Sequence, residues 1–211
     1  MKGPGRSLEV RLEPAQARAQ ETVEALLDTA ARLLEEVGLE GFNTNLLAAR
    51  AGVRVRTVYR YFPNKHAVIT QLATRAMTQW NSWFGELTRL VDPAVSLESV
   101  WSRLIDAYVQ GMRRMPGARA LRRAMRADDQ LRGLDDQDNA QLAHRVSEVL
   151  RHRWPCADGA SLRAASRVLL ESASSVIDVA LGCSRAKAAA MLAALKAMHA
   201  TYLRDLEVRA R

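Results

Sequence analysis

The stretch that most constrains this chain runs from Asn43 to Lys65 and reads NTNLLAARAGVRVRTVYRYFPNK. Its apolar residues predict two short helices with a turn at Gly52, because glycine adopts a left-handed conformation without a Cβ clash. Asn43 suits the N-cap of the first helix, since its side-chain oxygen accepts an amide hydrogen that the first turn leaves unpaired. Val58 and Phe62 are expected to point inward from the second helix. This spacing is typical of a helix-turn-helix, whose second helix enters the major groove of DNA.

The outward face of that second helix is expected to carry groups that suit DNA. Basic side chains neutralise phosphates, hydroxyl groups donate to phosphate oxygens, and a tyrosine ring packs against a thymine methyl. No Asp or Glu occurs between Gly41 and Gly85. The alternative is an ordinary solvated face, although such faces usually mix charge signs. The residues expected on the outward face are Arg54, Arg56, Thr57, Tyr59, Arg60 and Tyr61, with Lys65 beginning the next helix.

Over residues 21–72 the chain resembles the tetracycline-repressor (TetR) family of bacterial transcription regulators. The resemblance is carried by AARLLEEVGLEGF in the preceding helix, then Thr44, LLAARAGV and TVYRYFPNK. Arg54 and Arg56 stand where the family commonly has serine and a small residue, so its base preference is not carried over. The resemblance implies base contacts for Asn45, Val55 and Arg56, and mostly phosphate contacts for Thr44, Thr57, Tyr59, Tyr61 and Lys65.

We therefore expect an all-α protein with a three-helix DNA-binding domain and a larger helical domain. Residues 1–17 are expected to form a flexible arm, and 18–64 the helix-turn-helix domain. The resemblance implies that residues 65–211 bind an effector and dimerise. A minor-groove contact is the alternative to plain disorder in the arm. Gly38 is expected to end the first helix.

The net charge of +8 favours a polyanionic partner, either nucleic acid or an anionic membrane surface. No apolar run of about eighteen residues is present, so no membrane association through a spanning helix is expected. Two cysteines are too few for a disulfide framework and favour a cytoplasmic location.

Aromatic and methionine side chains gather on two consecutive helices, one beginning at Lys65 and the other at Ser96. Their helical spacing fits either plain core or the lining of an adaptable apolar cavity. The resemblance implies that a small-molecule effector binds in this region, and such a cavity would accept a hydrophobic or aromatic molecule. The alternative is an effector-independent regulator with a solid core. The expected lining is Trp80, Trp83, Phe84, Trp101, Tyr108 and Met112, with Met125 completing the wall.

A short helix over 118–126 carries four arginines on one face and two apolar residues on the other. The arginine face is expected to be solvated; a pocket for an anionic ligand and a second DNA contact are the alternatives. The next helix is expected to open at Asp135, Asp136 and Asp138, because carboxylates are favourable at a helix N-terminus.

The last two helices, over 161–181 and 184–208, are rich in small residues. Small residues let helix axes approach closely, which favours extensive helix–helix contact. The resemblance implies that these helices build the four-helix bundle of a homodimer, and a two-fold dimer matches a pseudo-palindromic double-stranded DNA operator. The expected interface residues are Leu162, Leu169, Ala173, Val176, Ala190, Leu195 and Met198.

Catalytic patterns are absent from the sequence. It contains no phosphate-binding glycine loop, nucleophile elbow or HExxH motif. His152 and Cys156 stand four residues apart, but Pro155 ends the helix between them and no third ligand is evident. We therefore expect no enzymatic activity, no cofactor and no metal site.

Overall fold

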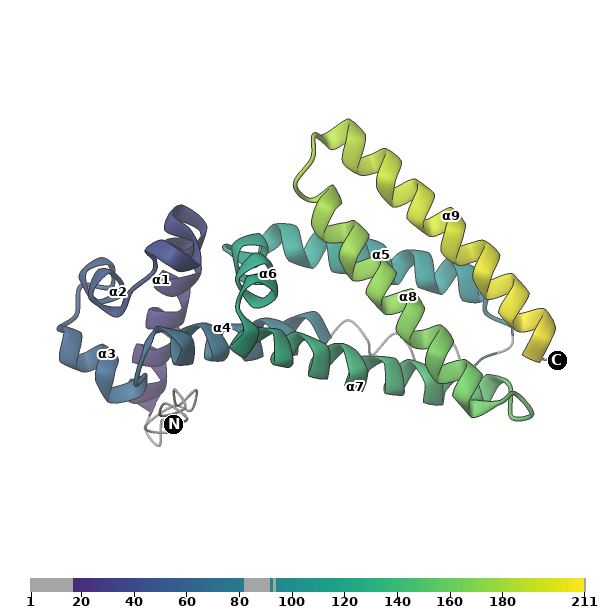
Figure 1. Ribbon diagram of the computed structural model, residues 1–211, viewed down its shortest axis with the longest axis horizontal. Coiled ribbons are helices and arrows are strands. Elements are labelled where there is room, and N and C mark those ends of the chain that lie inside the picture. The colour runs from purple at the N-terminus through teal and green to yellow at the C-terminus, as the bar shows by residue number, and fades with distance from the viewer. Residues whose placement is uncertain (1–16, 82–91, 93, 211) are drawn as a thin grey trace. The chain divides into compact units, whose positions relative to one another are not determined.

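The computed structural model describes residues 17–81, 92 and 94–210, without the side chains of Trp80 and Asn81. Every regular element in these ranges is an α-helix, which confirms the all-α prediction (Figure 1). None of the described helices is both long and apolar enough to cross a membrane. The helices are α1 (Ala17–Gly41), α2 (Thr44–Arg50), α3 (Val55–Tyr61), α4 (Lys65–Asn81), α5 (Leu97–Arg114), α6 (Ala118–Ala127), α7 (Asp129–Arg153), α8 (Gly159–Ala180) and α9 (Arg185–Ala210).

The chain divides into two compact units, which are described separately below. The first contains the described residues up to Thr78 together with Met115–Leu134, and the second contains Gln79–Arg114 and Asp135–Arg211. Helix α6 therefore belongs with the N-terminal helices, and within this unit it packs on α1.

Helix α1 supplies the central packing surface of the first unit. Gly38 interrupts it with a φ of 67°, and one further turn follows to Gly41. The sequence predicts a helix end at Gly38, and the regular helix does stop there. The extra turn is closed by the Phe42 amide, which donates to the Gly38 carbonyl at 3.1 Å. The fully buried residues around α1 include Leu26, Leu27, Leu34, Phe42, Leu47, Val58, Phe62, Ile69, Leu72, Leu121 and Met125.

Helix α6 is held closely against α1. Gly117, just before α6, has a φ of 72°, and a Cβ atom there would lie 2.2 Å from the Ala31 carbonyl oxygen. The Gly117 amide donates to the Glu35 carboxylate at 3.2 Å. Arg122 is only 4% exposed, so the prediction of a uniformly solvated arginine face is wrong at this position. Arg119, Arg123 and Arg126 are exposed.

Helix α7 begins six residues earlier than the sequence suggested. The Asp128 side chain accepts hydrogen bonds from the amides of Gln130 at 2.9 Å and Leu131 at 3.3 Å. Its carbonyl accepts from the Arg132 amide at 2.9 Å. Asp128 therefore caps the helix, and the expected opening carboxylate Asp135 is buried inside it.

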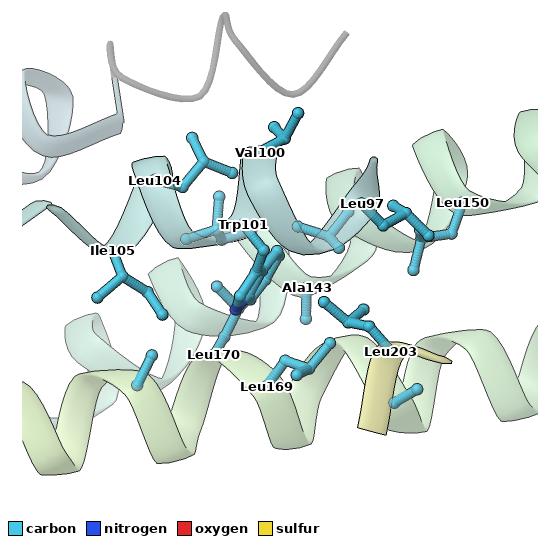
Figure 2. Close-up of a cluster of buried hydrophobic side chains, with 14 of the residues drawn as sticks. Leu97, Val100, Trp101, Leu104, Ile105, Ala143, Leu150, Leu169, Leu170 and Leu203 are labelled. Atoms are coloured by element: carbon cyan, nitrogen blue, oxygen red, sulfur yellow. The ribbon is translucent and has the colours of Figure 1, made fainter. Parts of the chain in front are cut away.

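The core of the second unit is built by α5, α7, α8 and α9. Trp101 of α5 lies among leucines from these helices, as Figure 2 shows for Leu169 and Leu170 of α8 and Leu203 of α9. Alanines and serines on α8, such as Ala165, are buried between the larger side chains. The small residues of α8 therefore allow close helix packing inside the unit.

A buried hydrogen-bond chain crosses this core and joins three helices. The Trp101 indole Nε1 donates to His199 Nδ1 at 2.8 Å, and Ser172 Oγ lies 2.9 Å from His199 Nε2. Because an indole can only donate, Nδ1 must accept, which places the imidazole proton on Nε2 facing Ser172. Ser172 Oγ in turn donates to the Val168 carbonyl at 2.6 Å. The polar side-chain atoms of Trp101, His199 and Ser172 therefore all have hydrogen-bond partners.

His199 is only 2% exposed, and desolvation lowers its pKa from 6.5 to about 4. The neutral imidazole is the form that accepts the Trp101 hydrogen bond. Stability from this group is therefore complete above the unfolded-state pKa and is lost as the pH falls toward 4.

We predict that the free energy of unfolding decreases by up to about 3 kcal/mol between pH 6.5 and pH 4 through His199 alone, since each pKa unit corresponds to about 1.4 kcal/mol. Urea unfolding at several pH values measures this. His199→Gln should lower stability at pH 7 and flatten the pH dependence. The matched control is His144→Gln, which changes an exposed histidine and should leave the pH slope intact. Equal slopes for His199→Gln and the unmodified protein would contradict the assignment.

Candidate nucleic-acid interface

Helix α2 begins at a side-chain cap, as the sequence predicted. Asn43 has an extended backbone, and its Oδ1 accepts a hydrogen bond from the Leu46 amide at 2.9 Å. Leu47 and Ala48 are buried under α2, whereas Asn45 is exposed on its opposite side. The cap and the two buried residues together fix the direction in which α2 enters the turn.

The turn between α2 and α3 is closed by backbone hydrogen bonds. The Val53 amide donates to the Ala48 carbonyl at 3.0 Å, and the Gly52 amide donates to the Ala49 carbonyl at 3.3 Å. Gly52 has a φ of 66°, which an L side chain adopts only at a cost. This left-handed residue redirects the chain so that α3 crosses beside α2 (Figure 1).

Helix α3 has one buried and one exposed side. Val58 is fully buried, and Phe62 follows it into the core directly after the helix. The exposed side carries Val55, Arg56, Tyr59 and Arg60, while Thr57 is half-buried and Arg54 is exposed at the N-cap position. These neighbours at positions i, i+1, i+4 and i+5 share one helix face, so basic and aromatic groups face solvent together.

Carboxylates of α1 neutralise two of the basic residues between Gly41 and Gly85, the part of the sequence that contains no Asp or Glu. Arg75 Nη1 lies 2.8 Å from Glu24 and 2.9 Å from Asp28, and Arg50 Nη1 lies 2.8 Å from Glu36. The arginines on and before α3, namely Arg54, Arg56 and Arg60, form no ion pair with any carboxylate among the described residues. Positive charge is therefore concentrated on the exposed face of α3.

Thr44 and Tyr59 meet across the two helices. The Thr44 hydroxyl donates to the Tyr59 hydroxyl oxygen at 3.1 Å. Thr44 is buried, whereas Tyr59 is 40% exposed. Because the Tyr59 oxygen accepts this bond, its own hydrogen can be donated outward. The pair orients a phenolic donor at the surface of the helix-turn-helix.

Tyr61 is the one residue expected on the outward face that the structure buries, at 5% exposed. It lies three positions after Val58 and so shares the inward side of α3. The Arg60 guanidinium carbon lies 5.7 Å from the centre of the Tyr61 ring, within the range of a cation–π contact. The ring thus supports a surface arginine, and its proposed phosphate contact stays a prediction.

The start of α4 is fixed by three contacts. The Ala67 amide donates to the Asn64 side chain at 2.9 Å, and Lys65 Nζ donates to the Leu39 carbonyl of α1 at 3.2 Å. Buried His66 places its Nε2 2.9 Å from the Asp128 carboxylate. Burial raises the pKa of Asp128, but the hydrogen bonds from His66 and from two backbone amides outweigh it, and the pKa lies below its usual value.

Two family models match the chain. One, described as bacterial regulatory proteins of the tetR family, matches residues 26–72, and the other, a tetracyclin repressor-like C-terminal domain, matches residues 95–206. The chain belongs to the tetR family. The TetR C-terminal model matches α5 to α9, and the N-terminal model includes α2 and α3. The resemblance noted in the sequence is thereby confirmed.

Known relatives agree with this TetR assignment. The tetracycline repressor protein class C of Escherichia coli is 35% identical over 126 residues, which are 54% of this chain and 53% of that protein. The chain therefore spans about half the length of this curated relative.

Solved structures show the same fold. A TetR-family regulator from Streptomyces coelicolor has a TM-score of 0.63 at 23% identity, covering 87% of this chain and 98% of that one. The SmeT–triclosan complex has a TM-score of 0.58 at 22% identity, covering 77% and 81%.

The residues expected to line an effector pocket fall in different places. Trp83 and Phe84, and the side chain of Trp80, lie outside the described residues. Trp101 and Met112 are buried in α5 of the second unit, and Tyr108 is half-buried there. The last expected wall residue, Met125, is fully buried within the first unit.

Several residues expected at the dimer interface are buried in the core of their own unit. These are Leu162, Leu169, Ala173 and Leu195, all buried. Val176 is half-buried, and Ala190 and Met198 are exposed. Val168 and Val179 of α8 are 57% and 56% exposed, and Val208 of α9 is exposed as well. The sequence prediction did not include these three apolar residues.

No group of three or more metal-binding side chains occurs in the part of the chain that the structure describes. His152 is hydrogen-bonded to the Glu148 carbonyl at 2.8 Å, and Cys156 is exposed.

We predict opposite effects on stability for two glycine-to-alanine substitutions at positions where the added methyl group would meet no neighbouring atom. Gly52→Ala should destabilise the protein by about 1–2 kcal/mol, because φ is 66° and only the backbone conformation opposes the methyl group. Gly133→Ala, within α7, should stabilise it by about 0.5–1 kcal/mol, because alanine favours the helix. Urea unfolding measures both. If Gly133→Ala destabilises the protein, then the backbone conformation of the glycine does not explain the opposite effects of the two substitutions.

Proposed function

We propose that this TetR-family chain is a sequence-specific transcriptional regulator that binds a pseudo-palindromic double-stranded DNA operator as a homodimer. In this proposal residues 18–64 bind DNA and residues 65–211 bind an effector and the partner chain, and the protein acts as a repressor in the cytoplasm. The observation that carries the proposal is the exposed face of α3, where Arg56, Tyr59 and Arg60 project without a neighbouring carboxylate.

The contacts divide between phosphate and base edges. Tyr59, positioned by Thr44, and Lys65 at the start of α4 suit phosphate oxygens, since their hydroxyl and ammonium groups can both donate hydrogen bonds. Arg56 lies on the exposed face near the N-terminus of α3, the part of a recognition helix that reaches base edges. We therefore assign Arg56 to base reading, together with Asn45 and Val55.

We predict strongly salt-dependent binding, because each neutralised phosphate releases counterions. Arg56→Ala should cost about 1–3 kcal/mol on the preferred site and relax the sequence preference, as expected for a bidentate contact to guanine. Lys65→Ala should weaken binding to all sequences and reduce the salt slope by about one per contact. Fluorescence anisotropy with preferred and scrambled duplexes at several salt concentrations measures these effects.

Arg103→Ala, an exposed arginine of α5, is the matched control for the loss of one charge. If Arg56→Ala weakens preferred and scrambled duplexes equally, then Arg56 is a phosphate contact and its assignment to base reading fails.

The dimer is proposed to form through α8 and α9. One recognition helix reads too short a site alone, and a two-fold dimer places two heads one or more helical turns of DNA apart. Val168, Val179 and Met198 are each more than half exposed on these two helices. Ala190 lies among other exposed alanines on α9, which would allow a partner helix to approach closely.

We predict that Ala190→Asp converts the dimer to a monomer, because a carboxylate would be buried without a partner charge. Sedimentation equilibrium measures this. Gln141→Asp, on the exposed side of α7, introduces the same group away from the proposed interface and should remain dimeric. A monomeric unmodified protein at micromolar concentration would refute the dimer.

A small hydrophobic or aromatic effector is proposed to bind near the tryptophans and to release the operator. The SmeT structure, which shares this fold, is a complex with triclosan. The satisfied Trp101–His199 bond instead favours the alternative of an effector-independent regulator with a solid core. A ligand changes DNA affinity only through its different affinities for the two DNA-head spacings, typically about 1–3 kcal/mol.

We predict that some apolar aromatic compound will change tryptophan fluorescence and release DNA with the same midpoint concentration. Screening by fluorescence, with operator release measured in parallel, tests both. Trp101→Phe should weaken the binding of the effector but should not change the DNA affinity that is measured without effector. Compounds that alter fluorescence without altering DNA binding would leave the effector-independent alternative.

A further inference from the structure

A cleft of about 690 Å³ lies in the first unit, and Lys65 is the one lining residue that the proposed function assigns to DNA. It is lined by the last turns of α1, the start of α4, one side of α6 and Asp128. None of the exposed residues of α3 lines it. This volume lies within the usual range for small-molecule sites.

The cleft is lined by side chains of both charge signs. Glu35 and Glu40 come from α1, Lys65 comes from α4 and Arg123 comes from α6. Buried Leu34 and Ala124 supply an apolar surface between them. The cleft therefore offers carboxylates, cations and a hydrophobic floor at one place.

These opposite charges do not pair with one another. Glu35 accepts a hydrogen bond from the Gly117 amide, and Lys65 Nζ donates to the Leu39 carbonyl, which leaves two of its hydrogens available. Glu40 and Arg123 form no ion pair with any described residue. An occupant that carried only one charge would pair with the groups of opposite sign and would face like charges in the same cleft.

We propose that this cleft binds a small zwitterionic molecule with an apolar body, of the amino-acid class. Its carboxylate would face Lys65 and Arg123, its ammonium group would face Glu35 and Glu40, and its body would cover Leu34 and Ala124. A charge-assisted carboxylate bond to arginine is among the stronger hydrogen bonds available. Such an occupant contacts α1, α4 and α6 at once, and it accounts for an exposed arginine on α6 that DNA binding leaves unused.

Three probes of matching shape separate the two charges: L-phenylalanine, 3-phenylpropanoate, which lacks the amine, and 2-phenylethylamine, which lacks the carboxylate. Titration of the isotope-labelled full chain followed by NMR measures each dissociation constant and locates the affected amides. We expect phenylalanine to bind at least about tenfold more tightly than either analogue, with shifts near Leu34, Lys65 and Ala124. Equal binding of all three, or shifts confined to the second unit, would overturn the proposal.

Two substitutions should act on different probes. Arg123→Gln should weaken the binding of phenylalanine and phenylpropanoate but leave the binding of phenylethylamine unchanged. Glu40→Gln should weaken the binding of phenylalanine and phenylethylamine but leave the binding of phenylpropanoate unchanged. Arg119→Gln is the matched control, because Arg119 is exposed on the same helix and does not line the cleft. If Arg119→Gln weakens phenylalanine as much as Arg123→Gln does, the attraction is general and no site exists. DNA affinity without probe tests the regulator separately.

Discussion

The burial of Val58 and Phe62 is the contact on which the DNA-facing part of this protein depends. Helix α3 has only seven residues, and an isolated helix of that length does not persist in water. It exists because Val58 and the following Phe62 are fully buried in the core of the first unit. The same packing forces Arg56, Tyr59 and Arg60 to the outside, so the exposed basic face is a direct consequence of the hydrophobic anchor.

Ion pairs and one hydrogen bond then determine which polar groups remain available around the exposed face of α3. Helix α1 carries carboxylates that pair with Arg50 and Arg75, and these two arginines therefore do not contribute free positive charge. The Thr44 hydroxyl orients Tyr59 from the neighbouring helix. Arg54, Arg56 and Arg60, which form no ion pair with a described carboxylate, remain exposed on and beside α3, the helix that we propose to read base edges.

The second unit contains polar side chains inside an apolar core, where each of them needs a hydrogen-bond partner. Trp101, His199 and Ser172 pass hydrogen bonds in one direction and end on a backbone carbonyl, so none is left unsatisfied. This chain requires neutral His199 and one tautomer. It joins α5, α8 and α9, the helices that we propose to carry effector contacts and the dimer, and so holds them in a defined arrangement.

The sequence alone determined the family, the all-α class, the helix-turn-helix, the N-cap at Asn43 and the left-handed glycines at positions 38 and 52. These are local properties, set by residues a few positions apart. Only the tertiary structure decided that Tyr61 and Arg122 are buried, that Asp128 opens α7, that Leu162 and Leu195 fill the core, and that Lys65 and Arg123 share a cleft with Glu40. Each of these depends on neighbours from distant parts of the sequence, whose approach no helical periodicity encodes.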